Sequence, residues 1–120
     1  PCVIKRLRGC GAGCEYVAIT PEGDIYPCHQ FVGNEDYKLG SLYDGTFDKE
    51  LSGRFAGLNI YTREECRDCW ARFYCSGGCS ASNLLVNGDI KKPHRVGCEL
   101  ERKRLECAIA LRAIAAGMAE

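Results

Sequence analysis

Four cysteines lie close together in the segment 66-CRDCWARFYCSGGC-79, with the spacing Cys-x2-Cys-x5-Cys-x3-Cys. A Cys-x2-Cys pair lets two thiolates reach one inorganic centre from a single turn of chain. A second pair nearby can complete the tetrahedral ligand set of zinc or the four corners of an iron-sulfur cube. Zinc ribbons tend to use two similar Cys-x2-Cys pairs on separate hairpins, whereas this segment has one. Spacing alone leaves both metals open.

Six further cysteines lie outside this segment, so the chain has ten in 120 residues. They are Cys2, Cys10, Cys14, Cys28, Cys98 and Cys107. Ten thiols suffice for two sites of four ligands each, with two left over. The sequence has no signal-peptide pattern, and thiols in the cytosol are kept reduced, which favours metal sites over a disulfide-stapled secreted domain.

Length and composition limit the other possibilities. A chain of 120 residues is one domain with a modest core, so metal binding is expected to contribute to its stability. Lys plus Arg equals Asp plus Glu at 16 each, which gives no net charge to attract nucleic acid or an anionic membrane. The longest apolar run is far too short to span a bilayer. We expect a cytoplasmic protein with no nucleic-acid or membrane partner.

The elements that position the cysteines can be predicted from local patterns. The segments 16-YVAI-19 and 25-IYPC-28 are typical of strands, and 21-PEGD-24 of the turn between them, which predicts a hairpin that ends at Cys28. Residues 30–45 are predicted to be irregular. A short helix is predicted over 46–55, with Thr46 as its cap.

Two later helical segments are also expected. The segment 62-TREE-65 has the form of a capping box, which predicts a helical turn that presents Cys66 and Cys69 on one side. A long amphipathic helix is predicted from Cys98 to Met118, with apolar residues at helical spacing. The fold class is therefore a small α+β metal-cluster domain with a β-hairpin, an irregular cysteine-rich middle and a C-terminal helix.

The cysteines and one glycine follow an ordered pattern over most of the chain: Cys10-x12-Gly23-x4-Cys28, a gap, Cys66-x2-Cys69-x5-Cys75-x3-Cys79, a gap, and Cys98. This pattern resembles that of SPASM domains, the auxiliary-cluster domains of radical SAM enzymes. The amino-acid sequences of three segments resemble more particularly those of the maturases that form thioethers in SCIFF ranthipeptides. The segments are 20-TPEGDIYPCHQFVGNEDYKLGSL-42, 69-CWARFYCSGGC-79 and 97-GCELERKRLECAI-109.

The resemblance implies two 4Fe-4S clusters. It assigns the distal cluster to Cys66, Cys69, Cys75 and Cys98. It assigns the proximal cluster to Cys10, Cys28 and Cys79, and leaves the fourth position open. We favour Cys14 as the fourth ligand, because a Gly-Ala-Gly loop joins it to Cys10; Cys2 or a site left open for a substrate thiolate are the alternatives.

The resemblance also implies that S-adenosylmethionine is bound by a separate radical SAM barrel, which is not expected within these 120 residues. Binding of S-adenosylmethionine in radical SAM enzymes requires a Cys-x3-Cys-x2-Cys loop, whereas Cys10-x3-Cys14 is followed by Glu15, Tyr16 and Val17. The chain is expected to be inactive alone, and to serve the radical SAM barrel of the same polypeptide by positioning a cysteine-rich precursor peptide or by transferring electrons. A zinc-binding interaction module without a redox role is the alternative.

Within one domain over 1–120, we expect a hairpin and proximal-cluster segment at 1–45, a helix and cluster motif at 46–97, and a helix at 98–118. Several further residues have an ordinary interpretation. Cys107 is predicted to be a buried small hydrophobe, and His29 to face solvent. His94 carries no signal. The three aromatic residues of the motif either shield the clusters or form core: Trp70, Phe73 and Tyr74.

Overall fold

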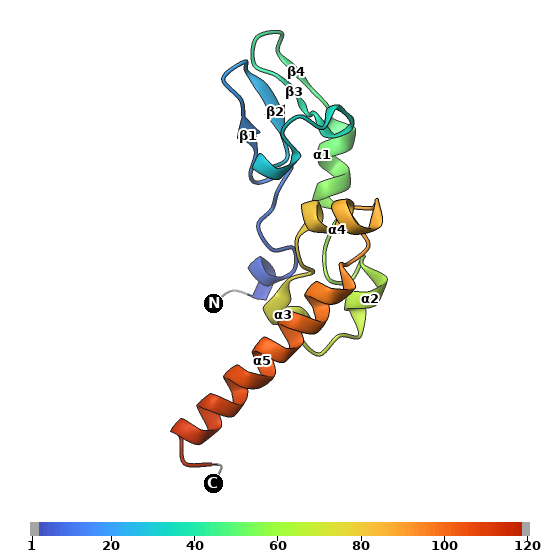
Figure 1. The fold of residues 1–120 in the computed structure, drawn as a ribbon. Coiled ribbons are helices and arrows are strands. Elements are labelled where there is room, and N and C mark those ends of the chain that lie inside the picture. The colour runs from blue at the N-terminus through green and yellow to red at the C-terminus, as the bar shows by residue number, and fades with distance from the viewer. Residues whose placement is uncertain (1–2, 119–120) are drawn as a thin grey trace.

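The computed structural model describes residues 3–118. The protein is elongated, with extents of 63 × 24 × 22 Å. A small sheet and α1 (Lys49–Ala56) form one end, and α5 (Arg95–Ala115) extends from the other end, as Figure 1 shows. Three short helices within and directly after the cysteine motif lie between these two ends. They are α2 (Glu64–Arg67), α3 (Arg72–Cys75) and α4 (Ser80–Asn87).

The sheet has four antiparallel strands in the order β1-β2-β3-β4. Their bounds are β1 Ala18–Ile19, β2 Asp24–Tyr26, β3 Gly40–Ser41 and β4 Thr46–Phe47. The predicted hairpin is confirmed as the β1–β2 pair, with Ala18 opposite Tyr26, and its strands are shorter than predicted. Gly23 makes the turn with a φ of 82°. Cys28 lies just beyond β2, where it precedes a 3-10 helix, η2 (His29–Phe31).

The segment predicted to be irregular contains more structure than expected. It holds η2, a second 3-10 helix, η3 (Glu35–Tyr37), and β3, while a further 3-10 helix, η1 (Val3–Arg6), begins the described chain. A Cβ at Gly40 would collide with the carbonyl oxygen of Thr46, so only glycine lets β3 approach β4 so closely.

Two predicted helix caps are wrong. Thr46 lies in β4, and α1 is capped by Asp48, whose Oδ1 accepts a hydrogen bond from Leu51 N at 2.9 Å. Thr62 does not cap α2, because its hydroxyl donates to Gly57 O at 2.7 Å and its oxygen accepts from Asn59 N at 2.9 Å. The side chains with capping chemistry are used by neighbouring turns, and α2 begins one residue later, after Arg63.

The hydrophobic core lies between the sheet and α1. Phe31, Tyr37 and Phe55 form an aromatic cluster with ring centroids 5.2–6.1 Å apart. Cys28 belongs to this core, which also contains Ile25, Tyr26, Leu39, Leu51, Leu58 and Ile90. The packing of the hairpin against α1 therefore fixes the position of one predicted cluster ligand.

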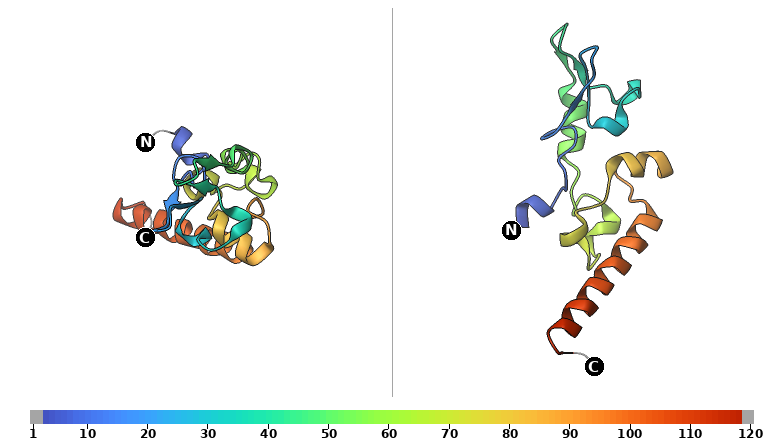
Figure 2. Two further views of the ribbon diagram at one scale, coloured as in Figure 1. Left: turned by 90° about the horizontal axis from the view of Figure 1, so that it is seen from above. Right: turned by 60° about the vertical axis from the view of Figure 1, so that its left-hand side comes forward.

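The last helix is confirmed, and it begins at Arg95 rather than at Cys98. Leu105 is buried, whereas Cys107, Leu111 and Ile114 are exposed. The prediction that Cys107 is a buried small hydrophobe is therefore wrong, because the outer half of α5 extends away from the other elements (Figure 2). No helix within residues 3–118 has both the length and the apolar character needed to cross a membrane.

Candidate metal centre

The four cysteines predicted to hold the distal cluster line one cavity. Cys66 lies in α2, Cys69 in the turn after it, Cys75 at the end of α3, and Cys98 in the first turn of α5. Two single-turn helices joined by a tight connection present the first three thiols on one side. The chain then returns through α4, and α5 places Cys98 beside them. Residues far apart in sequence thus share one site.

Burial of the thiols in this cavity disfavours free thiolates. Burial raises the pKa of the Cys66 thiol to about 11, opposed by the positive charge of Arg63, and neighbouring thiols raise it further. Burial also raises the pKa of Cys98, and the Cys75 thiol adds to this effect. Closely grouped thiols with raised pKa values ionise when a cation compensates their charge. Such a set is suited to a metal centre.

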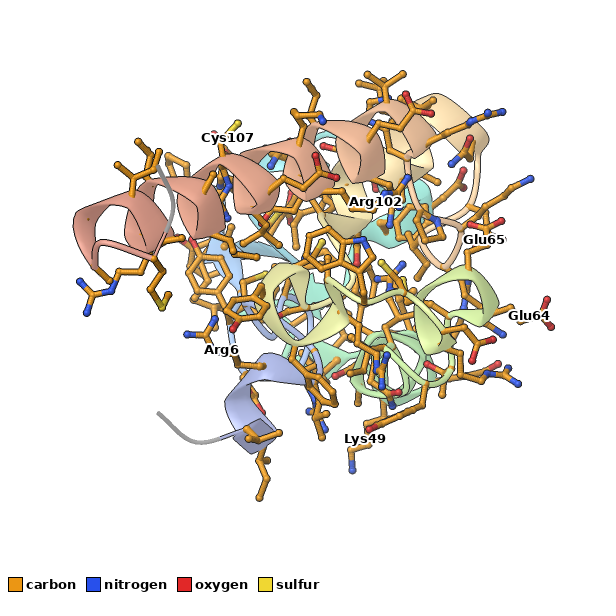
Figure 3. All side chains as sticks on the ribbon, turned by 90° about the horizontal axis from the view of Figure 1, so that it is seen from below. Arg6, Lys49, Glu64, Glu65, Arg102 and Cys107 are labelled. Atoms are coloured by element: carbon orange, nitrogen blue, oxygen red, sulfur yellow. The ribbon has the colours of Figure 1, made fainter. Side chains whose placement is uncertain are left out.

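The position of Cys98 on α5 separates it clearly from Cys107. Cys98 is half-buried in the first turn of the helix and Cys107 is exposed two turns further on. In Figure 3, Arg102 points from α5 towards α2, whereas Cys107 lies on the side of α5 that faces away from α3. Arg102 lines the same cavity as Cys98, and its charge opposes the rise in the pKa of that thiol that burial causes.

The segments predicted to hold the proximal cluster are neighbours. The side-chain Nε2 of Gln30, two residues after Cys28, lies 3.7 Å from Sγ of Cys79. Gly13 N donates to Pro27 O at 3.1 Å, which joins the 10–14 loop to the chain beside Cys28. The other end of this loop reaches the cluster motif, because a Cβ at Gly9 would lie 3.6 Å from Cβ of Ser76.

The individual proximal thiols differ in their surroundings. Cys28 is buried, and Cys10 and Cys79 are exposed. Cys14 is half-buried; its Sγ lies 3.4 Å from Gly11 O and 3.7 Å from Nη1 of Arg8. Cys2 lies outside the described residues. Within residues 3–118, no three His, Cys, Asp or Glu side chains meet closely enough to hold a single metal ion.

Cys79 has an environment that favours its thiolate. It is the N-cap residue of α4, and its thiol makes no capping hydrogen bond of standard geometry. Burial raises the pKa of Cys79, but the nearby N–H groups of Ser82 and Ala81, the Ser82 hydroxyl and the Gln30 amide outweigh burial, so the net pKa is lowered. The start of α4 therefore prepares Cys79 to bind a cation as a thiolate.

Two arginines beside the thiols have a buried nitrogen without a partner. Among side chains in residues 3–118, the buried nitrogen and oxygen atoms that lack a hydrogen bond are Nε of Arg63 and Nε of Arg72. Arg72 lines the cavity of the distal cysteines. Burial lowers the pKa of Arg63, and negative charge on Cys66 and Cys75 would raise it. Buried donors are normally satisfied, and sulfur acceptors of a bound cluster would suit these N–H groups.

The donor set therefore fits an iron-sulfur cluster. Each thiolate of a 4Fe-4S cluster binds a different iron, so its ligands stand farther apart than four sulfurs around one zinc at about 2.3 Å. The distal thiols line the wall of a cavity, and the unpartnered N–H groups lie beside them. Iron-sulfur clusters are held by thiolate ligands, and N–H donors near their sulfurs tune the reduction potential.

Sequence reasoning missed several residues of this region. Arg63, Arg72 and Gln30 gave no signal, because each acts through contacts with distant segments. His94 lines a second cavity together with Cys75, Cys79 and Cys98, among others. His29 is exposed, as predicted. Trp70 and Tyr74 are 49% and 63% exposed, so they are not core; they line an apolar groove against α5 that is separate from the distal cavity.

Comparison with known families identifies the family of this chain. The model of the SPASM family, described as an iron-sulfur cluster-binding domain, matches residues 10–70, which are 61 of the 120 residues. The matched segment runs from Cys10 through the sheet and α1 to the first two cysteines of the motif. The small α+β fold and its grouped thiols define an iron-sulfur domain. The chain belongs to the SPASM family of iron-sulfur cluster-binding domains.

Individual relatives are longer proteins. An uncharacterized protein of Archaeoglobus fulgidus is 31% identical over 101 residues, which cover 81% of this chain and 24% of that protein. PqqA peptide cyclases of Xanthomonas axonopodis pv. citri and Xanthomonas euvesicatoria pv. vesicatoria are 31% and 30% identical over 84 residues. These matches cover 66% of this chain and 22% of each cyclase. The chain thus spans about a quarter of the length of these curated relatives.

Proposed function

We propose that this chain is the auxiliary-cluster domain of a radical SAM enzyme that modifies a precursor peptide, and that it holds two 4Fe-4S clusters. The observation that carries the proposal is the single cavity lined by Cys66, Cys69, Cys75 and Cys98 in a member of the SPASM family. Two relatives are named PqqA peptide cyclases, which supports a peptide as the substrate class.

The finer assignment concerns the cross-link. The resemblance of three segments to the maturases of SCIFF ranthipeptides supports thioether formation in a cysteine-rich peptide, with the radical SAM barrel in the same polypeptide. When bound, the clusters supply one-electron redox chemistry or an iron that binds a substrate thiolate. The chain's own residues group the thiols, bury Cys28 and Cys66, and place N–H groups of Gln30 and Arg72 near the ligand sets.

The two proposed clusters have separate ligand sets. Cys66, Cys69, Cys75 and Cys98 form the distal set. Cys10, Cys14, Cys28 and Cys79 form the proximal set, which is supported by the contacts of Gln30 with Cys79 and of Gly13 with Pro27. Because each set joins segments that are distant in sequence, cluster binding also stabilises the fold.

Metal analysis after anaerobic reconstitution tests this proposal. We expect about eight iron and about eight sulfide per chain for two 4Fe-4S clusters. A zinc interaction module would instead give a colourless protein with zinc and no acid-labile sulfide after the same treatment. A reproducible content near four irons would remove one cluster from the proposal.

A second measurement tests the division of labour. With strong reductant and S-adenosylmethionine, we expect this chain to form no 5'-deoxyadenosine, because Cys10 and Cys14 are not followed by the third cysteine of the required loop. Formation of 5'-deoxyadenosine would show that the chain carries its own SAM-binding cluster.

A further inference from the structure

Arg63 is a buried positive charge without an acidic partner among the described residues. The residue is only 3% exposed. Its Nη1 donates to Ile90 O at 2.7 Å and to Lys91 O at 2.8 Å, and its Nη2 donates to Ser80 Oγ at 3.0 Å. All three acceptors are neutral. A buried charge is costly unless an opposite charge balances it.

The guanidinium lies against the loop that separates the two proposed clusters. A Cβ at Gly77 would lie 3.0 Å from Nε of Arg63, so this nitrogen packs on the chain between Cys75 and Cys79. Cys75 is a ligand of the proposed distal cluster and Cys79 of the proximal cluster. Arg63 therefore packs on the segment that joins a ligand of one site to a ligand of the other, and its Nε has no hydrogen-bond partner.

The groups near Arg63 that can carry a negative charge are Asp89 and three thiols, which become thiolates when they bind a cluster. Burial lowers the pKa of Arg63, and the charges of Cys66, Asp89, Cys75 and Cys79 oppose this effect. Asp89 is exposed and forms no ion pair with Arg63 within residues 3–118. The thiolates of the two ligand sets are thus the partners that can balance the buried guanidinium.

We propose that Arg63 is the positive charge shared by the two ligand sets, and that it raises the reduction potential of the clusters they hold. This inference rests on the proposed function. Reduction adds one electron to a cluster and leaves its thiolate ligands in place, so the negative charge of the site increases by one. A fixed cation stabilises the reduced form more than the oxidised form, and net charge and hydrogen bonds to sulfur set the potential.

A purely structural role is the competing explanation, because the hydrogen bonds of Arg63 also connect α4 with residues 90–91. Two variants separate charge from hydrogen bonding. R63Q removes the charge and keeps an amide donor, whereas R63K keeps the charge and loses the planar fork of N–H groups. R67Q is the control: Arg67 follows Cys66 directly, but it is exposed and its charge is screened by solvent.

The experiment is a dithionite titration of anaerobically reconstituted protein, followed by electron paramagnetic resonance, after iron and sulfide have been measured. Dithionite supplies the electron. We expect R63Q to lower the potential of at least one cluster by a tenfold change in the one-electron equilibrium, or 59 mV. R63K and R67Q are expected to stay within a threefold change. If R63Q does not retain clusters whereas R63K does, with full iron content and the wild-type potential, the contrast shows that the clusters require the positive charge and not the fork of N–H groups.

Three results would overturn it. In the first, R63Q keeps full iron content at the wild-type potential. In the second, R63K shifts the potential as far as R63Q does, which shows that the hydrogen-bond fork is responsible. In the third, R63K loses its clusters as R63Q does. Wild-type protein without iron and sulfide would overturn the proposed function itself, whereas wild-type protein with clusters and an unshifted R63Q overturns only the role of Arg63.

Discussion

Nε2 of Gln30 lies 3.7 Å from Sγ of Cys79, although the two residues are 49 positions apart in the sequence. Gln30 belongs to the short helix that follows Cys28, and Cys79 directly precedes α4. The contact joins the end of the hairpin to the end of the cysteine motif. It supports the assignment of Cys28 and Cys79 to one cluster, and it adds a side-chain N–H donor to that site.

Replacement of Gln30 by alanine should raise the pKa of Cys79, because the variant loses a hydrogen-bond donor that stabilises the thiolate. We expect several-fold slower alkylation of Cys79 near neutral pH in metal-free protein and a lower reduction potential in reconstituted protein. H29A is the matched control, since His29 is adjacent and exposed. Equal behaviour of the two variants would exclude a role for Gln30.

Cys98 and Cys107 should differ in their effect on iron content. C98A removes one of the four thiols that line the distal cavity, and we expect it to lose about half of the iron, as for one of two clusters. C107A removes an exposed thiol on the other side of α5 and should leave iron and sulfide unchanged. Loss of iron in C107A, or full content in C98A, would contradict the assigned ligand set.

The fourth proximal ligand can be tested by C14A. If Cys14 completes the proximal set, this variant should lose iron from that cluster or change its spectroscopic signature. The structure places its thiol in a loop next to the chain beside Cys28. An unaltered signature with full iron content would instead favour an open coordination site.

Gly77 and Gly78 should respond differently to alanine. Both have positive φ, at 91° and 75°, so either substitution costs about 1 kcal/mol of backbone strain. A Cβ at Gly77 also meets Arg63, whereas nothing lies within 4 Å of a Cβ at Gly78. G77A should therefore lower the unfolding midpoint and iron content more than G78A does. Equal effects would show that backbone strain alone matters.

The metal-free protein should titrate in a defined order. Burial raises the pKa of Cys66 to about 11, and the pKa of Cys79 is lowered by N–H donors that outweigh its burial. Alkylation of Cys79, followed by mass spectrometry, should therefore reach half its maximal rate at a lower pH than alkylation of Cys66. If both thiols titrate together, the metal-free chain does not hold them as described.

The same shift predicts how stability depends on pH. The folded chain keeps Cys66 neutral to a higher pH than the unfolded chain does, where a thiol ionises near pH 8.5. Its contribution to the free energy of unfolding is therefore fully present below that pH and is lost as the pH rises towards about 11. Urea unfolding should show that the free energy of unfolding of the wild-type protein decreases between pH 8 and 11. The decrease should be smaller in C66A.

Grouped thiols and much of the local structure could be predicted from the amino-acid sequence, whereas the spacing of the cysteines left zinc and iron-sulfur both open. The number and spacing of the cysteines predicted thiolate sites, the turn at Gly23 predicted the hairpin, and helical periodicity predicted α5. These features depend on residues that are near one another in the chain. Local rules failed at Thr46 and Thr62, because each hydroxyl makes a hydrogen bond with a different neighbour from the one that capping requires.

Which groups lie near the thiols depends on contacts between distant segments of the chain. In the sequence, Arg63 is not distinguished from the other charged residues. In the structure, α4 and residues 90–91 pack around it and bury its guanidinium against Gly77, between Cys75 and Cys79. Cys107 shares the apolar periodicity of α5, yet it is exposed because it lies on the side of that helix that faces away from α3. Burial depends on contacts between distant segments, and no local pattern specifies them.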